Sequence, residues 1–401
     1  MGFFSNLFNK NQDPELKDFE YEIENENTVI LTKVKKNVEN VVIPGKTSKY
    51  NKVKIRVLKG FIPKNAKTVK IEPGVEVDLF FEKFLYKNKY VEEIEGLENL
   101  DVSNVERFFY SFTDNKALKK INVHWPNIKA KDMCGFISGN KSLKEIDITG
   151  LDTSNVEIMG YMFNGNKELE IIKGLETLDT SNAKNMDSLF FDNDKIKNLD
   201  VSNFNTENVE NMEAIFLSCE NLEYLDLGNW NTKNVKSMKQ LFCGCDNLKE
   251  IKGVENLDVS NVENMEMIFE GCKLLKELNL SNWNTKNVKT VWSMFSKTDS
   301  LEKVDLTNWN TSNLEDAGSW FSSAKNLKEI KGIEDLDVSN VKSFNQAFWW
   351  LCSLDSLDIS KWDLRSLEDI KKFEYSKTKL IINENDQKQR LIKEYNISQN
   401  K

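Results

Sequence analysis

The chain has very little histidine and proline. Its 401 residues include one histidine, His124, and five prolines. A histidine-dependent hydrolase or acid–base enzyme would have to work through His124, because no second histidine is present. His124 lies beside Trp125 and Pro126, a setting typical of a solvated loop. No other set of residues with catalytic spacing is visible, so we predict that the protein is not an enzyme.

Excess positive charge and long apolar runs are also absent. The 55 Lys and Arg residues are outnumbered by 64 Asp and Glu residues, for a net charge of −9. A nucleic-acid partner needs a basic face, and a membrane span needs about 18 apolar residues in succession, so we expect neither. The N-terminal MGFFSNLFNKNQ lacks the basic and apolar regions of a secretory signal. Asn6 stands where N-myristoylation requires Ser or Thr.

Metal-ligand spacing is missing as well. None of the six cysteines forms a C-x-x-C pair, and six scattered cysteines in a long chain do not predict a disulfide framework. Only Cys243 and Cys245 are close enough in sequence to converge on a metal. Free thiols without a cofactor are therefore the prediction. The full set is Cys134, Cys219, Cys243, Cys245, Cys272 and Cys352.

What the chain does contain is an internal repeat of 26 or 27 residues. One asparagine, here called the marker, recurs at Asn104, Asn155, Asn182, Asn208, Asn234, Asn261, Asn287, Asn313 and Asn340. Apolar residues stand one, four, seven and eight positions past it, which predicts one face of a helix capped by the marker or its neighbour. The run Leu222-x-x-Leu225-x-Leu227 predicts a short strand. About twelve such strand–helix units across 77–382 would stack into a solenoid.

Columns of equivalent residues separate core from turn positions. Trp230, Trp283, Trp309 and Trp362 fill a column that Leu occupies elsewhere, so the column is predicted to be core. Cys219, Cys245 and Cys272 alternate with Asn in another column, which favours a structural role in a buried turn over zinc. Asp or Asn recurs three positions before the marker, which indicates hydrogen-bonded turns more than calcium ligands. Gly174, Gly253 and Gly332, spaced 79 residues apart, predict a bend after the strand.

The stretch LDVSNVENMEMIFEGCKLLKELNLSNWNTKNV resembles the BspA-like leucine-rich-repeat proteins. The resemblance covers residues 77–382 and implies a curved α/β solenoid. It also implies a surface-displayed or secreted bacterial protein that binds other proteins, often as an adhesin. We see neither an export signal nor a surface anchor in the sequence. An intracellular scaffold that uses the same surface is therefore the alternative.

The expected fold is an α/β leucine-rich-repeat-type solenoid in four parts. Four of the five prolines precede residue 74, and the strand-like runs TVILTKV and KVKIRVL stand in the same region. We predict a flexible segment at 1–18, a β-rich cap at 19–76, the solenoid at 77–382, and a C-terminal cap with a polar tail at 383–401.

Candidate partner-binding residues come from two groups. The exposed strand positions carry charges of both signs and Tyr224, and Lys173, Lys252 and Lys331 recur there every third unit. This face is either an ordinary solvated sheet or a surface for a protein partner. Trp292, Trp349 and Trp350 fall outside the core columns. They form either a binding patch or, for Trp349 and Trp350, packing under a C-terminal cap. The sequence predicts neither the identity of the partner nor the oligomeric state.

Overall fold

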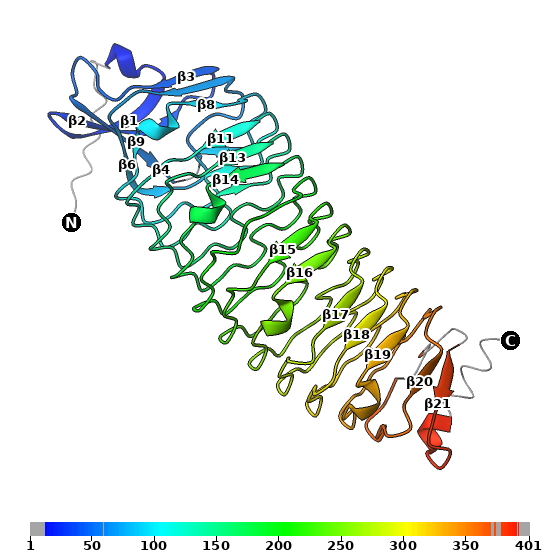
Figure 1. Cartoon of the computed structure of the whole chain (residues 1–401). Coiled ribbons are helices and arrows are strands. Elements are labelled where there is room, and N and C mark those ends of the chain that lie inside the picture. The colour runs from blue at the N-terminus through cyan, green and yellow to red at the C-terminus, as the bar shows by residue number, and fades with distance from the viewer. Residues whose placement is uncertain (1–12, 59, 370–372, 374–377, 391, 393–401) are drawn as a thin grey trace.

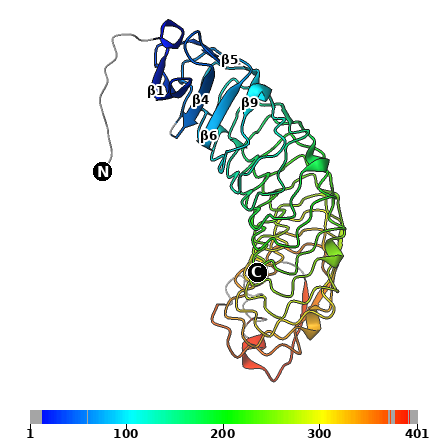
Figure 2. The same ribbon diagram turned by 90° about the vertical axis from the view of Figure 1, so that its left-hand side faces the viewer.

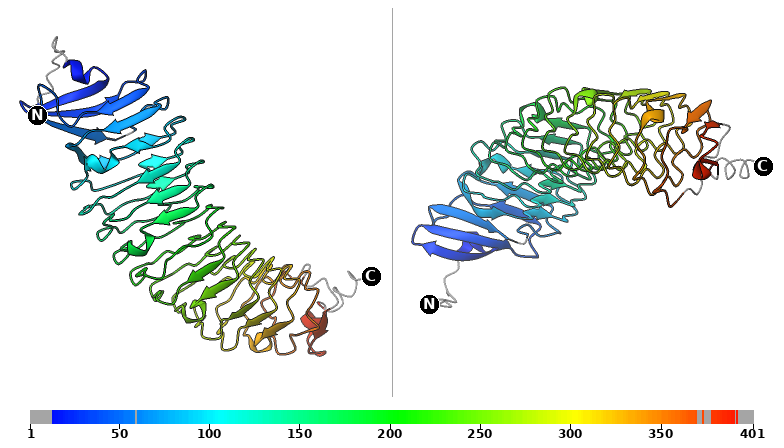
Figure 3. Two further views of the ribbon diagram at one scale, coloured as in Figure 1. Left: turned by 45° about the horizontal axis from the view of Figure 1, so that its top comes forward. Right: turned by 90° about the horizontal axis from the view of Figure 1, so that it is seen from below.

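The computed structural model describes residues 13–58, 60–369, 373, 378–390 and 392. The chain winds into a parallel β-solenoid of about 14 turns, here called rungs, stacked along one axis (Figure 1). The solenoid bends along its length, and strands β1 and β21 lie at its opposite ends (Figures 2 and 3). The predicted flexible segment 1–18 and the polar tail 383–401 fall largely outside the described residues.

The first rungs carry the longest strands. Strands β1 and β2 form an antiparallel hairpin, and the next strands add in parallel to give the order β1-β2-β4-β6-β9. The run TVILTKV is β2, and KVKIRV is β4. The elements are η1 (Pro14–Leu16), β1 (Phe19–Asn25), β2 (Thr28–Val34), β3 (Asn40–Ile43), β4 (Lys52–Val57), β5 (Thr68–Ile71), β6 (Val75–Phe81), β7 (Leu85–Tyr86), β8 (Ile94–Glu95), β9 (Leu100–Asp101), β10 (Phe112–Thr113) and β12 (Ile137–Ser138).

A column of short parallel strands, here called the strand ladder, continues along one side. Each strand pairs in register with a neighbouring rung, as Leu278 does with Val304. Single β-bridges link the rungs on another side, from Phe80 to Asp369. The ladder consists of β11 (Lys120–Asn122), β13 (Glu145–Asp147), β14 (Ile171–Lys173), β15 (Tyr224–Asp226), β16 (Glu250–Lys252), β17 (Glu277–Asn279), β18 (Lys303–Asp305), β19 (Glu329–Lys331), β20 (Ser356–Asp358) and β21 (Lys379–Ile381).

The predicted helices after each marker are wrong, and with them the α/β class. In the described residues α-helix is confined to 387–390 and 392, beyond the repeats. Within a rung, the N–H groups of Met186, Ser188 and Phe190 bond to carbonyls of the next rung, at 2.9–3.1 Å. An α-helix would direct them to carbonyls four residues back. Two left-handed residues, Ser188 (φ 54°) and Asp192 (φ 60°), turn the chain so that the apolar positions still face inward.

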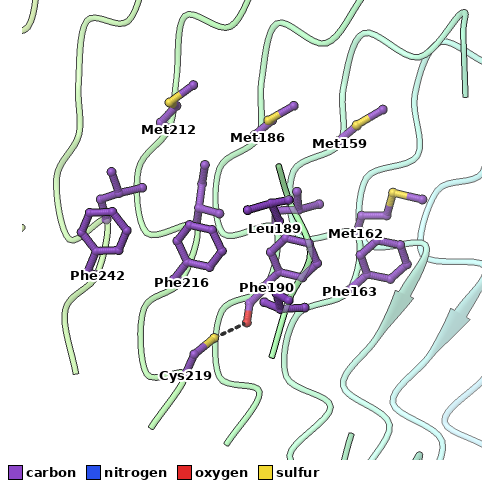
Figure 4. Close-up of a cluster of buried hydrophobic side chains, with 14 of the residues drawn as sticks. Met159, Met162, Phe163, Met186, Leu189, Phe190, Met212, Phe216, Cys219 and Phe242 are labelled. Carbon is purple, nitrogen blue, oxygen red and sulfur yellow. Dashed lines mark hydrogen bonds between the residues drawn. The ribbon is translucent and has the colours of Figure 1, made fainter. Parts of the chain in front are cut away.

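The predicted core columns are confirmed. Phenylalanines eight positions past the marker are fully buried and stack from rung to rung, with ring centroids of Phe163, Phe190 and Phe216 5.8 and 5.9 Å apart (Figure 4). Methionines four positions past the marker, such as Met186 and Met212, form a parallel buried column. The tryptophan column is also core, since Trp283 is 2% exposed. Because each rung buries its apolar face against its neighbours, the stack forms one continuous core.

Polar columns bond one rung to the next. The marker asparagines are not helix caps, because there is no helix to cap. Instead, Asn182 Nδ2 donates to the Ser154 carbonyl of the preceding rung at 2.6 Å, and Asn208 and Asn261 bond equivalently. The Asp/Asn column does form turns, as predicted: Asp258 Oδ1 accepts the Ser260 N–H at 2.9 Å. These bonds satisfy backbone groups that irregular chain would leave unpaired.

The glycines of the long period begin a sharp bend, as predicted. Gly253 has φ 83°, and a Cβ added there would lie 2.7 Å from Cα of Gly228, so only glycine fits. Each bend opens a 3₁₀ turn, and these turns lie along the outer edge of the curved solenoid in Figure 2. They are η2 (Leu97–Asn99), η3 (Leu175–Thr177), η4 (Val254–Asn256) and η5 (Ile333–Asp335).

Candidate functional site

The strand ladder holds the three predicted lysines, each already paired with an acid of the preceding rung. The Nζ–carboxylate distances are 2.7 Å for Lys173–Glu145, 2.6 Å for Lys252–Asp226 and 2.8 Å for Lys331–Asp305. Hydrogen bonding to the acid raises the pKa of Lys252 and lowers that of Asp226. The ladder is therefore a charge-compensated face, from which Tyr224 projects with 40% of its surface exposed.

The bridge side of the solenoid is built differently. We define the turn face as the outward residues five, six and ten positions past each marker, together with the bridge residues beside them. The residues six and ten positions past the marker have left-handed backbones, as at Gln240 (φ 59°) and Gly244 (φ 71°). These two positions face away from the core, which the residues between them, such as Leu241 and Phe242, fill. Residue identity on the turn face varies from rung to rung.

Trp292 stands on this turn face with 36% of its surface exposed. Its indole lies over Gly318 of the next rung, where an added Cβ would be 2.9 Å from Trp292 Cδ1. Beside it is a polar hollow of about 290 Å³ that Asp316 and Asn345 help to line. Burial raises the pKa of Asp316, although its bond from the Gly318 N–H opposes that shift. This hollow offers a ring, a carboxylate and an amide to a partner.

Trp349 and Trp350 do not line the hollow beside Trp292. Trp350 has a left-handed backbone (φ 63°) and is 51% exposed, whereas Trp349 is half-buried. The predicted tryptophan group is therefore divided between two places on the C-terminal rungs. An exposed tryptophan with a strained backbone is a candidate contact residue, because such strain is kept where neighbouring structure or function enforces it.

A second hollow, which the sequence did not predict, lies on the N-terminal rungs. We call it the aromatic pocket: about 320 Å³, with Tyr86, Phe109, Tyr110 and Tyr161 among its lining residues. Tyr110 and Tyr161 both stand six positions past the marker. The predicted helix would have placed that position on a solvent-exposed helix face and not beside a pocket. Aligning the sixth position across rungs is the signal that would have found them.

His124 and the cysteine column are the other features that the sequence singled out. His124 is exposed, and its Nδ1 lies 2.5 Å from the Thr149 carbonyl oxygen. The cysteine column has the structural role that was predicted, since Cys219, Cys245 and Cys272 donate to buried carbonyls. Across the described residues no group of three or more His, Cys, Asp or Glu is arranged to hold a metal. Within the same residues, no helix has the length and hydropathy of a membrane span.

The stacked strands, the asparagine and leucine columns and the continuous core define a solenoid protein of the leucine-rich-repeat type. The chain belongs to the family described as Mycoplasma protein of unknown function, DUF285, whose model matches residues 80–171, 165–252, 245–332 and 302–399. No curated protein sequence matches the chain.

Several solved structures are similar to this chain at low sequence identity. A leucine-rich repeat protein from Bacteroides ovatus is 15% identical, with 90% of this chain and 88% of that one covered and a TM-score of 0.37. A leucine-rich repeat protein from Eubacterium ventriosum is 14% identical, with 90% and 93% covered and a TM-score of 0.31. A leucine rich cell surface protein from Faecalibacterium prausnitzii is 15% identical, with 80% and 94% covered and a TM-score of 0.29.

Proposed function

We propose that the protein is a non-enzymatic scaffold that binds another protein, as an adhesin-like surface or secreted protein of the BspA-like class. The observation that carries the proposal is the contrast between constant inward columns and a varied turn face. The position five past the marker reads Asp187, Glu213, Lys239, Glu266 and Trp292 along five successive rungs, while the core columns barely change. A repeat that keeps its interior and varies one outward column supports a long recognition surface.

The exposed tryptophans make the C-terminal half of the turn face the proposed contact region. Tryptophan is enriched among residues that dominate the energy of protein interfaces. Neither Trp292 nor Trp350 is needed to fill the core, because Phe295 and Phe348 occupy that column in the same rungs. The ladder lysines are proposed as secondary contacts, since each would have to exchange an existing ion pair for a new one.

Proximity labelling on intact producing cells tests this proposal. The full chain is compared with Trp292→Ala and with a Trp349→Ala/Trp350→Ala double variant. Leu274→Ala, which removes another exposed apolar side chain, serves as the control. We expect at least about tenfold less labelling of a specific protein by the tryptophan variants and no change for the control. Unchanged labelling together with unchanged melting would exclude this contact region.

An intracellular scaffold is the second candidate, and the cysteines favour it. All six are free, and the unpaired thiols suit a reducing compartment. Cys352 is exposed and reports the location directly. A membrane-impermeant maleimide applied to intact cells labels Cys352 if the protein is displayed outside, and labels it only after lysis if the protein is internal. A Cys352→Ser variant identifies the labelled site.

A further inference from the structure

The aromatic pocket contains two tyrosines in a backbone conformation that bulky residues rarely adopt. Tyr110 has φ 51° and Tyr161 has φ 58°. In later rungs the same left-handed position is held by smaller or flexible residues, including Ser188, Ala214 and Ser293. Aromatic side chains are therefore not needed to build this turn. Two of them, two rungs apart, place an exposed ring, that of Tyr161, and a half-buried ring, that of Tyr110, on one surface at the expense of local strain.

Two glycines in the rung between the tyrosines make room for neighbouring side chains of the pocket. The ring of Tyr110 lies over Gly135, where an added Cβ would be 2.4 Å from Tyr110 Cε1. At Gly139 an added Cβ would be 2.5 Å from Asp114 Oδ1. Any other residue at either glycine would displace a wall of the pocket. The rung between the two tyrosines therefore carries no side chain at the positions beneath the Tyr110 ring and beside Asp114.

The rings are held in place before any ligand binds. Phe109 and Tyr110 meet edge to face with centroids 4.6 Å apart. The Arg107 guanidinium lies 5.4 Å from the Phe109 centroid and 5.6 Å from that of Phe80, and it is paired with Glu82. Burial and the neighbouring Cys134 thiol raise the pKa of Tyr110 to about 12, so its hydroxyl stays neutral. Such preorganisation lowers the entropy lost when a ligand binds.

The polar rim selects the kind of ligand. Asp114 is exposed at the pocket edge, and Asn164 and Thr113 line it. Asp114 and Asn164 present a carboxylate and an amide next to aromatic faces, whereas the Thr113 hydroxyl is buried and donates to the Gly135 carbonyl at 3.0 Å. A sugar ring has the matching chemistry, because its C–H face is apolar and its edge carries hydroxyl donors and acceptors. The volume of about 320 Å³ lies at the lower end for ligand sites and suits a small ligand such as one or two sugar rings.

The same observations disfavour an extended peptide. A peptide that adds a strand needs free backbone donors and acceptors at a sheet edge. Here Lys87, Tyr110 and Asp114 donate their N–H groups to carbonyls of the next rung at 3.0 Å. We propose that the aromatic pocket binds a sugar ring of a neutral oligosaccharide, which stacks on Tyr110 and Tyr161 and hydrogen-bonds to Asp114 and Asn164.

Ligand-observed saturation-transfer NMR with the full chain tests the proposal. The probes are maltotriose, cellotriose and triacetylchitotriose at millimolar concentration. We expect saturation of ring C–H protons for at least one of the three. Tyr161→Ser, which installs the residue that Ser188 provides at the same position, should weaken that binding about tenfold. Tyr224→Ser removes an equally exposed tyrosine from the ladder and should leave it unchanged.

A second variant guards against a structural effect of losing the tyrosine. Asp114→Asn keeps the size of the side chain and tolerates the left-handed backbone (φ 59°), and it should also weaken the sugar by several fold. Binding of none of the three probes overturns the proposal, as does binding that both pocket variants leave intact. Saturation of a decaproline peptide that Tyr161→Ser abolishes, without sugar binding, would assign the pocket to peptides instead. The protein-binding proposal stands or falls separately, because its variants lie on the C-terminal rungs.

Discussion

One buried column of the solenoid changes its chemistry halfway along. Asparagine fills it in five successive rungs and cysteine in the next three, all with no exposed surface. Both residue types donate to the equivalent carbonyl of the preceding rung. Asn193 Nδ2 donates to the Phe163 carbonyl at 3.0 Å, and Cys219 Sγ donates to the Phe190 carbonyl at 3.2 Å. The column is Asn88, Asn115, Asn140, Asn166, Asn193, Cys219, Cys245 and Cys272.

The asparagine rungs and the cysteine rungs differ in the other hydrogen bonds made at this position. Asn166 Oδ1 accepts the Asn140 N–H at 2.9 Å, and the asparagines from Asn115 to Asn193 all clamp the preceding rung in this way with a donor and an acceptor. In the cysteine rungs the backbone N–H of each cysteine has a carbonyl partner within its own rung. The Cys245 N–H, for example, donates to the Phe242 carbonyl at 3.1 Å. The asparagine and cysteine rungs thus use a side-chain donor here, but the position does not require one, because Ala324 and Leu351 fill it in later rungs.

The largest expected effect comes from removing an asparagine. Asn166→Ala leaves the Ile137 carbonyl and the Asn140 N–H without their side-chain partners, 2.9 Å away in each case. Each stranded buried group costs about 1–3 kcal/mol, so we expect a loss of about 3 kcal/mol or more. Urea unfolding followed by circular dichroism measures it. A loss below about 1 kcal/mol would show that the asparagines of this column are not a main source of stability.

Removing a cysteine should cost less. Cys245→Ala removes the bond from the thiol to the Phe216 carbonyl at 3.1 Å, but that carbonyl still accepts the Cys219 N–H at 3.1 Å, so no backbone group is left without a partner. We expect about 1–2 kcal/mol by the same urea measurement. Cys245→Ser is the matched control, since a hydroxyl restores the donor and should recover part of the loss. A cost equal to that of Asn166→Ala would break the distinction between the two halves.

Thiol reactivity tests, without a mutation, whether the cysteine rungs stay closed in the native protein. Burial raises the pKa of Cys219 to about 12 and holds those of Cys245 and Cys272 well above the ordinary value. The thiolate is the reactive form, so native protein at pH 8 should alkylate rapidly at the exposed Cys352 and only on unfolding at these three. Mass spectrometry after timed iodoacetamide treatment reads this out. Rapid labelling of Cys245 in the native state would mean that the cysteine rungs open locally.

Much of this architecture was predictable because each core position recurs in successive repeats, so its apolar character is seen many times. The buried Phe163 and Trp283 columns and the glycine bends follow from alignment alone. The helices were predicted wrongly because apolar spacing of one, four, seven and eight fits a helix and this turn equally well. What separates them is the left-handed backbone at Ser188 and Asp192, and neither residue type demands that conformation.

The sites were harder to predict, because they depend on contacts between rungs. Lys252 looks like a free cation in sequence, yet its partner Asp226 stands 26 residues earlier on the adjacent strand. Tyr110 gains its significance from Gly135 in the following rung. Alignment of the columns gives such neighbours only after the register of the rungs is known, and the helix prediction obscured that register at the sixth position.

The smallest expected effect lies on the ladder, where rung-to-rung bonds are made in water. Lys252→Ala removes an ion pair between an exposed lysine and a half-buried aspartate at the surface, and such pairs contribute little because solvent and salt screen them. We expect the melting temperature to change by no more than its experimental error in physiological salt. Lys331→Ala, which breaks the equivalent pair with Asp305, is the parallel variant and should behave alike.

If low salt reveals a stability difference between wild type and Lys252→Ala, the pH dependence of that difference identifies its cause. Hydrogen bonding to Lys252 lowers the pKa of Asp226 in the folded protein. A depressed carboxyl pKa contributes stability above the ordinary value of about 3.9, and that contribution is lost as the pH falls through the folded value. The raised pKa of Lys252 contributes below the ordinary lysine value and is lost as the pH rises through the folded one. The stabilities of wild type and Lys252→Ala should therefore differ only at pH values between the folded-state pKa of Asp226 and that of Lys252. A difference that persists in strong acid would have to come from packing of the lysine stem and not from its charge.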